Sequence, residues 1–355
     1  MPLLRAEWWE AHQPLVVFMW IILLVVPFAI VYGAGDTFET VLECIVNDYL
    51  TFIVLLFRLF CVSGNITVGG DFAGSPRVNA CLLALGTLLS SCIGTTGASM
   101  LMVRPVIKMN SWRKRKRHIM VFFIFLISNM GGCLTPIGDP PLLMGFMRGV
   151  LPGMSAFQDA AGNVRGIRLY GEVTLTLPAL IEIVIILLAA FLSFKTTDSS
   201  IRTKNHFTWG AIKEVAVLFI GIFITMQPAL MLLKSVGPNL GISEPYQMFW
   251  ATGALSSFLD NTPTYLVFLT TAGTLGLTGG ITTALGQIPV NLLEAISCGA
   301  VFMGANTYIG NAPNFMVKAI SDENGVNMPS FFGYILWSLA FLVPVFMLDM
   351  LVFFL

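Results

Sequence analysis

Two aspartates in apolar surroundings are the residues of this chain best suited to chemistry. Asp139 lies in TPIGDPPLLM (135–144), and Asp260 lies in SFLDNTPTYL (257–266). An ionised carboxylate inside a membrane is costly unless it is paired, protonated or bound to a cation. Neither stretch contains Lys or Arg, so we expect the two carboxylates to bind a cation or protons. The structural alternative for each aspartate is a helix cap beside a Pro or Thr.

Amide and hydroxyl side chains accompany both aspartates, and oxygen ligands of this kind suit hard cations. The candidate residues for binding an ion or substrate are Thr95, Thr96, Ser128, Asn129, Thr135, Asp139, Asp260, Asn261, Thr262, Asn306, Thr307 and Asn311. Within this set, the expected ligands of Na⁺ are Asp139, Asp260, Asn261 and Asn311. We expect no catalytic residue and no bound cofactor, only a transported or coupling Na⁺ or H⁺.

The candidate residues fall in segments that occur twice. Residues 135–144 match 307–316 (TYIGNAPNFM), with Thr, Ile, Gly, the second Pro and Met in register. Residues 90–103 (SSCIGTTGASMLMV) match 256–269 (SSFLDNTPTYLVFL). Paired polar segments, broken by Gly and Pro, are typical of secondary transporters whose site lies near the bilayer midplane.

This alignment distributes the two carboxylates between the halves. It places Asp139 opposite Asn311, and Asp260 opposite Gly94. Each half therefore supplies one carboxylate. Asp139 comes from a broken helix, and Asp260 comes from a hairpin tip.

The composition places these segments in a membrane. Apolar residues make up 56% of the chain and charged residues only 11%, with a mean hydropathy of +0.83, whereas soluble domains carry about 25% charged residues. Runs that approach or exceed the ~20 residues of a membrane-spanning helix are 14–32, 41–63, 173–194, 211–233 and 331–355. The first run is too long for a signal peptide. We expect a multi-pass protein of the cell inner (plasma) membrane.

Basic loops orient the chain in the bilayer. Residues 112–118 read WRKRKRH, and further basic residues follow between 195 and 213; the positive-inside rule makes both loops cytoplasmic. Such clusters are common in short membrane loops, so this explanation is preferred to a nucleic-acid or lipid-binding patch, and no nucleic-acid partner is expected. If both loops are cytoplasmic, residues 78–108 must start and end on one side. They are therefore predicted to form a re-entrant hairpin with GTTG at its tip.

The predicted fold is an all-α membrane protein built from two inverted repeats, each with a hairpin and a broken helix. An N-terminal helix occupies 1–40. The first repeat (41–195) contains the hairpin 78–108 and the broken helix 119–149, and the second (211–355) contains the hairpin 247–271 and the broken helix 289–320. The alternative is that the Gly, Pro, Ser and Thr clusters are ordinary helix-packing sites.

At these motifs the chain resembles the ion-transporter superfamily, which includes D-type sodium/proton antiporters, arsenite permeases, citrate–metal symporters and sodium–dicarboxylate symporters. The likeness extends over about 8–355 and is greatest to the branch of citrate transporters and sodium:proton antiporters. The motifs that carry it are IGTTGASMLMVRP (93–105), SNMGGCLTPIGDPPLL (128–143), SFLDNTPTYLVF (257–268) and YIGNAPNFM (308–316).

The resemblance implies an elevator-type transporter, in which hairpins and broken helices form a mobile transport domain beside a scaffold that forms a homodimer. Two features depart from the family pattern. The first tip reads GTTG instead of the SNT-type tip of the dicarboxylate symporters, which weakens the case for binding a carboxylate. Many relatives also begin with another apolar segment before the stretch around Trp8.

The favoured function is sodium/proton antiport, with cation and protons competing for Asp139 and Asp260. The alternatives are a cation-coupled carrier of citrate or another carboxylate, then an arsenite permease, and then a channel. An intramembrane aspartyl protease is disfavoured because its Tyr-Asp helix should precede its Gly-Asp helix, whereas Gly138–Asp139 comes first here. The partners implied are small inorganic cations, the lipid bilayer and, in the second case, a carboxylate. Glu182, midway along its helix, is a candidate for relaying protons.

Overall fold

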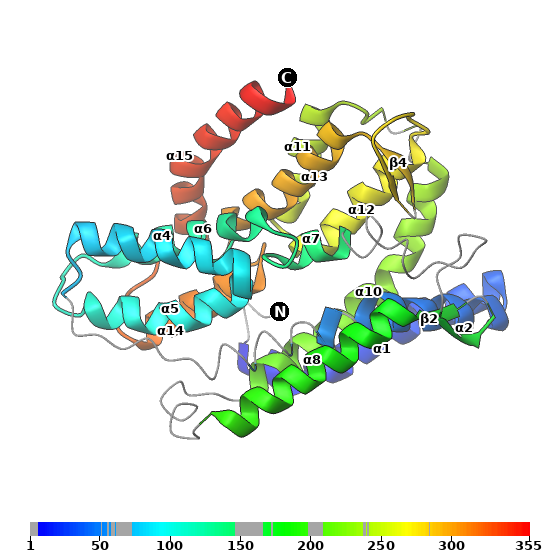
Figure 1. Cartoon of the computed structure of the whole chain (residues 1–355), viewed down its shortest axis with the longest axis horizontal. Coiled ribbons are helices and arrows are strands. Elements are labelled where there is room, and N and C mark those ends of the chain that lie inside the picture. Colours follow the sequence, from blue (N-terminus) through cyan, green and yellow to red (C-terminus); the bar gives the residue numbers. More distant parts are fainter. Residues whose placement is uncertain are drawn as a thin grey trace. The chain divides into compact units, whose positions relative to one another are not determined.

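The computed structural model (Figure 1) describes residues 6–50, 52–54, 57, 61, 73–145, 166–171, 173–197, 209–236, 239, 241–283 and 285–355. These residues are mostly helical and form two compact units. The first unit is Met1–Cys61 with Pro152–Leu232, and the second is Val62–Leu151 with Leu233–Leu355. Each unit takes segments from both predicted repeats, so the sequence repeats and the spatial units divide the chain differently.

The first unit consists of long apolar helices and one short β-hairpin. Its elements are α1 (Ala6–Tyr32), α2 (Ala34–Glu43), the π-helix η1 (Cys44–Tyr49), β1 (Gly166–Tyr170), β2 (Val173–Thr176), α8 (Leu177–Thr196) and α10 (Gly210–Val236). The helix predicted at 14–32 is present within α1. Residues 146–165, which include the end of the broken helix predicted at 119–149, are outside the described residues.

Close packing of α10 with its neighbours holds the first unit together. The rings of Phe52 and Phe219 stack with centroids 4.6 Å apart, and the Tyr49 hydroxyl donates to the carbonyl of Ala216 (3.0 Å). A Cβ added at Gly221 would lie 2.6 Å from Val17 Cγ1, so glycine is required where α1 approaches α10. On the outside of α1 and α8, side chains such as Phe18 and Phe191 are exposed, as expected of surfaces that face lipid.

A helical hairpin opens the second unit. Helix α4 (Pro76–Ile93) and helix α5 (Thr95–Met109) are separated by Gly94, whose φ of 79° suits glycine. At the other end, Asn79 and Asn110 exchange two amide hydrogen bonds of 2.8 and 2.7 Å. The hairpin predicted for 78–108 is therefore present, and its two open ends lie together. Its re-entrant placement in the bilayer stays a prediction.

The remaining elements of the second unit repeat this plan. The first broken helix contains α6 (Arg117–Leu126), the 3₁₀ turn η2 (Met130–Leu134) and α7 (Pro140–Gly145). The second hairpin is α11 (Pro245–Ser256) and α12 (Asn261–Thr274), and the second broken helix is α13 (Val290–Met303), η6 (Gly304–Asn306) and α14 (Ala312–Glu323). The chain ends with α15 (Phe331–Asp349) and the π-helix η7 (Met350–Phe354).

Six helical segments among the described residues are long and apolar enough to cross a membrane: 11–32, 76–93, 117–134, 179–196, 215–232 and 331–354. A multi-pass helical membrane protein is thus confirmed. The all-α prediction needs one correction, because two antiparallel hairpins are present, β1–β2 and β3 (Ile281–Thr283) with β4 (Gly286–Ile288). Both are short two-stranded ribbons outside the predicted hairpins and broken helices.

Candidate ion-binding site

Side-chain donors form hydrogen bonds with backbone carbonyls that have no helical partner at the two helix breaks. Backbone polar groups in a membrane must find partners inside the protein. In the first break, Asn129 Nδ2 donates to Ile124 O (2.9 Å) and Ser91 Oγ donates to Gly131 O (2.6 Å). In the second, Asn314 Nδ2 donates to Gly304 O and Thr307 O, both at 2.9 Å. These four carbonyls are therefore engaged within the protein.

Matched positions of the two repeats make equivalent hydrogen bonds between hairpin and break. Thr135 Oγ1 donates to the carbonyl of Ser91, and Thr307 Oγ1 donates to the carbonyl of Ser257. In the alignment Thr135 corresponds to Thr307 and Ser91 corresponds to Ser257. These two candidate residues, Thr135 and Thr307, thus hold each hairpin against the neighbouring broken helix.

A glycine at the matched position of each half allows the hairpin tip to approach the helix break closely. A Cβ at Gly132 would lie 2.6 Å from Thr95 Cγ2, and a Cβ at Gly304 would lie 2.1 Å from Asn261 Oδ1. Both distances are shorter than van der Waals contact. The hairpin tips can therefore reach the breaks only because these positions carry no side chain.

Asp139 lies in the first break, at the point where the tips of both hairpins contact it. Its carboxylate is 1% exposed. Oδ1 accepts a hydrogen bond from Thr95 Oγ1 (2.7 Å), and Oδ2 accepts one from Asn261 Nδ2 (3.1 Å). Hydrogen bonds to both oxygens stabilise a negative charge that burial makes costly. No Lys, Arg or His forms an ion pair with Asp139 among the described residues.

A network of amides joins the two repeats beside Asp139. Asn129 Nδ2 donates to Asn314 Oδ1 (2.7 Å), and Asn311 Nδ2 donates to Asn129 Oδ1 (3.1 Å) and to Ser128 O (3.1 Å). Ser128 Oγ lies 2.7 Å from Ser99 Oγ. All five side chains are buried, so the cluster is a closed polar core shared by both halves of the sequence.

Asp260 occupies a different position from Asp139. Its Oδ1 accepts a hydrogen bond from the backbone N–H of Thr262 (3.1 Å) and caps helix α12, which is the structural role named as the alternative. The next residue, Asn261, donates from Nδ2 to Asp139 Oδ2 (3.1 Å), so one amide side chain connects the Asp260 cap to Asp139. Asp260 therefore lies beside the cluster, whereas Asp139 lies within it.

Asn306 carries an unused acceptor at the second break. Its Nδ2 donates to Ser257 Oγ (2.9 Å), whereas its Oδ1 is buried and has no hydrogen-bond partner in the described part of the chain. A buried acceptor without a partner costs about 1–3 kcal/mol. Such an oxygen is available to a cation.

The structure thus sorts the predicted residues into groups. The cluster consists of two hydrogen-bonded sets, Asp139 with Thr95 and Asn261, and Asn311 with Ser128 and Asn129. Thr96 is half-buried, and its side chain makes no hydrogen bond among the described residues. The side chain of Glu182 lies outside what the structure describes, so its role stays a prediction.

Two further serines, Ser256 and Ser257, contact the site although they were not among the predicted residues. Ser256 Oγ donates to Asn261 Oδ1 (2.9 Å) and Ala300 O (2.6 Å), and Ser257 Oγ donates to Met303 O (3.1 Å). The signal that could have identified them is the serine pair that precedes each hairpin tip, at 90–91 and at 256–257.

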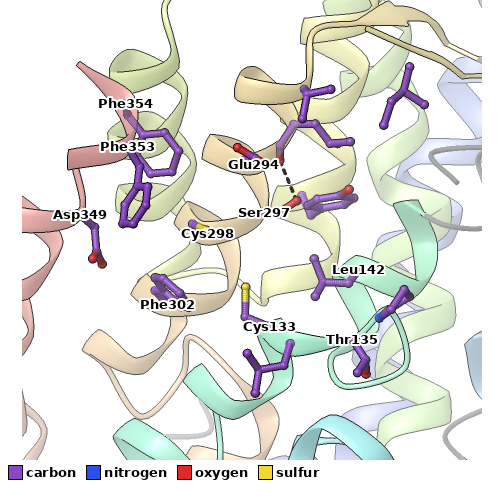
Figure 2. Close-up of a pocket in the computed structure, with 16 residues that line it drawn as sticks. Cys133, Thr135, Leu142, Glu294, Ser297, Cys298, Phe302, Asp349, Phe353 and Phe354 are labelled. Atoms are coloured by element: carbon purple, nitrogen blue, oxygen red, sulfur yellow. Dashed lines mark hydrogen bonds between the residues drawn. The ribbon is translucent and has the colours of Figure 1, made fainter. Parts of the chain in front are cut away.

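A cavity of about 670 Å³ lies on one side of the first break (Figure 2). The break contributes Cys133, Thr135 and Leu142 to its wall, and α13 contributes Glu294 and Cys298. The wall is mainly apolar and does not include Asp139. An ion in this cavity would therefore need a movement of the break or of a hairpin to reach the buried carboxylate.

Comparison with known families agrees with this architecture. The model of a family described as "Putative citrate transport" matches residues 1–158 and 154–354. The chain belongs to this family. It is therefore a member of the ion-transporter superfamily, in its citrate-transporter branch, and a multi-pass membrane transporter. No curated protein matches the chain.

Proposed function

We propose that this protein is a cation-coupled secondary transporter of citrate or a similar carboxylate, and that the coupling cation or proton binds at Asp139. The observation that carries the proposal is the carboxylate of Asp139, which is 1% exposed and bonded by Thr95 of one repeat and Asn261 of the other. We further propose that it works in the cell inner membrane, as a homodimer.

Charge balance supports a cation or proton at this carboxylate. A buried, unpaired carboxylate is strongly unfavourable, and the two donors to Asp139 are neutral groups. A cation or a proton supplies the missing countercharge. Asn306 Oδ1 offers a further oxygen at the second break.

Two helix N-termini beside the cluster support binding of an anion. Helix α5 begins after Gly94 and helix α14 begins after Asn311, and neither has a side-chain cap. The N–H of Thr95 already donates to Gly138 O, and in α14 Pro313 has no N–H and the N–H of Asn314 donates to Asn311 O. An anion would therefore be attracted mainly by the positive ends of the two helix dipoles and by the remaining first-turn N–H groups. Because Asp260 caps α12, we expect the carboxylate substrate at α5 and α14. A bound cation would offset the charge of Asp139.

Uptake into liposomes tests this function. The purified protein, reconstituted with an inward gradient of Na⁺, Mg²⁺ or H⁺, should accumulate labelled citrate with at least one of these gradients. Asp139→Asn should reduce gradient-driven uptake at least tenfold, because the amide carries no charge. The exposed control Asp36→Asn should retain it. Absence of citrate uptake under all three gradients would exclude the proposal.

Sodium/proton antiport is the second candidate function. The position of Asp260 next to Asn261, which donates to Asp139 Oδ2 (3.1 Å), favours it, because two nearby carboxylates without a basic partner can exchange a cation for protons. With a pH-sensitive dye inside the liposomes, antiport predicts proton movement when Na⁺ or Li⁺ is added without citrate. A citrate symporter predicts no such movement until citrate is present.

A further inference from the structure

A shallow groove of about 460 Å³ lies at the start of helix α15. One end is formed by Arg117, the first residue of α6, and by Ser330. The wall continues along one face of α15 through Gly333, Leu336, Trp337 and Phe341. The groove therefore has a cationic head and an apolar, aromatic body.

Arg117 is held at the head of the groove with donors to spare. Its Nε donates to the carbonyl of Asn327 (2.5 Å), and no other hydrogen bond of this side chain occurs among the described residues. A guanidinium has five N–H donors in a planar fork that suits phosphate. The side chain is exposed, so four of these donors can face a ligand.

The charges around the groove favour an anion. Arg117 ends the basic run 113–117, and no acidic residue lines the groove. The nearby Asp322 is already engaged, because Lys318 Nζ lies 2.8 Å from its Oδ2 and Met328 N donates to its Oδ1 (2.9 Å). Arg117 is therefore the charged group that the lining of the groove itself presents to a ligand.

The body of the groove fits an acyl chain in length and chemistry. From Ser330 to Phe341 the helix rises about 16 Å at 1.5 Å per residue, roughly half of a ~30 Å hydrocarbon core. The rings of Trp337 and Phe341 stack with centroids 5.5 Å apart, and Phe341 also contacts Phe122 of α6 edge-on at 5.3 Å. These rings form a fixed apolar wall that is one leaflet deep.

We propose that this groove binds an anionic phospholipid of the cytoplasmic leaflet, with its phosphate at Arg117 and an acyl chain along α15. The basic run places the head of the groove on the cytoplasmic side, where anionic lipids attract basic residues near the membrane surface. Contact between Arg117 and Asn327 puts the starts of α6 and α15 on the same side. A neutral lipid or a helix of another chain would leave the guanidinium without a partner.

Native mass spectrometry of the full chain in detergent tests the proposal independently of transport. The probes are phosphatidylglycerol and phosphatidylcholine with the same acyl chains. Wild type should bind phosphatidylglycerol about tenfold more tightly. Arg117→Gln should weaken that binding about fivefold, because a basic residue at the surface contributes about 1 kcal/mol. Arg115→Gln, an exposed basic residue outside the groove, should leave it unchanged.

A second pair of variants tests the apolar body while Arg117 is retained. Ala340 lines the groove and Leu339 does not, and both are exposed. Ala340→Trp should fill the groove and weaken phosphatidylglycerol binding at least fivefold, and Leu339→Trp should not. Equal binding of the two lipids, equal loss in Arg115→Gln and Arg117→Gln, or unchanged binding in Ala340→Trp would each overturn the proposal.

Discussion

At the scale of single residues, Asp139 and Asp260 have separate roles although their sequence surroundings are alike. Asp260 precedes a helix and caps it, whereas Asp139 receives hydrogen bonds from Thr95 and Asn261. The sequence predicted that both would lie near the site, because both interrupt apolar segments. It could not separate them, since the distinction depends on which hairpin tip approaches which break.

Loss of one hydrogen bond to Asp139 should weaken binding of the coupling cation. Thr95→Val keeps the shape of the side chain but removes the hydroxyl that donates to Oδ1 (2.7 Å). Hydrogen bonds to charged groups contribute about 1.5–3 kcal/mol. We therefore expect the concentration of cation that gives half-maximal uptake to rise at least fivefold.

The matched control for this variant is the neighbouring Thr96→Val, because the hydroxyl of Thr96 makes no hydrogen bond among the described residues. It should leave the half-maximal concentration within about twofold. Equal effects in both variants would mean that the contact between Thr95 and Asp139 has no part in cation binding.

The amide network should contribute to stability as well as to the site. Asn129→Ala removes a side chain bonded to Ile124 O, Asn314 and Asn311, and each buried group left unpaired costs about 1–3 kcal/mol. The variant should show a clear fall in melting temperature in detergent. The exposed control Asn327→Ala should melt like wild type; equal melting of Asn129→Ala would show that water or lipid replaces the lost partners.

At the scale of elements, the breaks and tips could be predicted because Gly, Pro and paired polar residues recur in register. The structure breaks helices at Gly94, after Ser256, after Leu126 and after Met303, whereas the inverted relation of the two repeats stays a prediction. The short hairpins β1–β2 and β3–β4 were missed. Strands of three to five residues are too short for a periodic pattern to identify.

Glycines at the breaks should tolerate no side chain. Gly132→Ala would place a Cβ 2.6 Å from Thr95 Cγ2 and 2.9 Å from Asp139 Cβ, so the tip and the carboxylate must move apart. We expect transport to fall at least tenfold, since displacements of about 1 Å at a site can cost 10²-fold. The control Gly35→Ala meets no atom within 4 Å and should transport normally.

The equivalent substitution in the other repeat tests whether the two halves work alike. Gly304→Ala would place a Cβ 2.1 Å from Asn261 Oδ1, and Asn261 donates to Asp139. We expect a loss of transport similar to that of Gly132→Ala. Normal transport in Gly304→Ala would show that the second break does not position the site.

At the scale of the whole molecule, the chain divides into two compact units, whereas the transport domain and scaffold that the resemblance implied stay a prediction. All residues of the ion-binding cluster belong to the second unit. The sequence could not show this division, because the units are formed by packing between segments far apart in the chain. Elevator motion itself stays a proposal.

Motion of one unit against the other should be measurable by fluorescence transfer between labels. A pair of labels with one member in each unit should change its distance when cation and citrate are added, because the buried site must reach both sides of the membrane. A pair placed within the second unit, for example on α4 and α14, should keep its distance. A change only in the second pair would indicate a local gate and not an elevator.

The central claim, that Asp139 couples substrate to cation or proton, is tested most directly by comparing two fluxes of Asp139→Asn in the same liposomes. Gradient-driven accumulation of citrate should be lost, because the amide cannot take up a cation or proton. Exchange of labelled for unlabelled citrate, without a gradient, should persist because the substrate can still be carried across. Accumulation by Asp139→Asn at the wild-type rate would contradict the account.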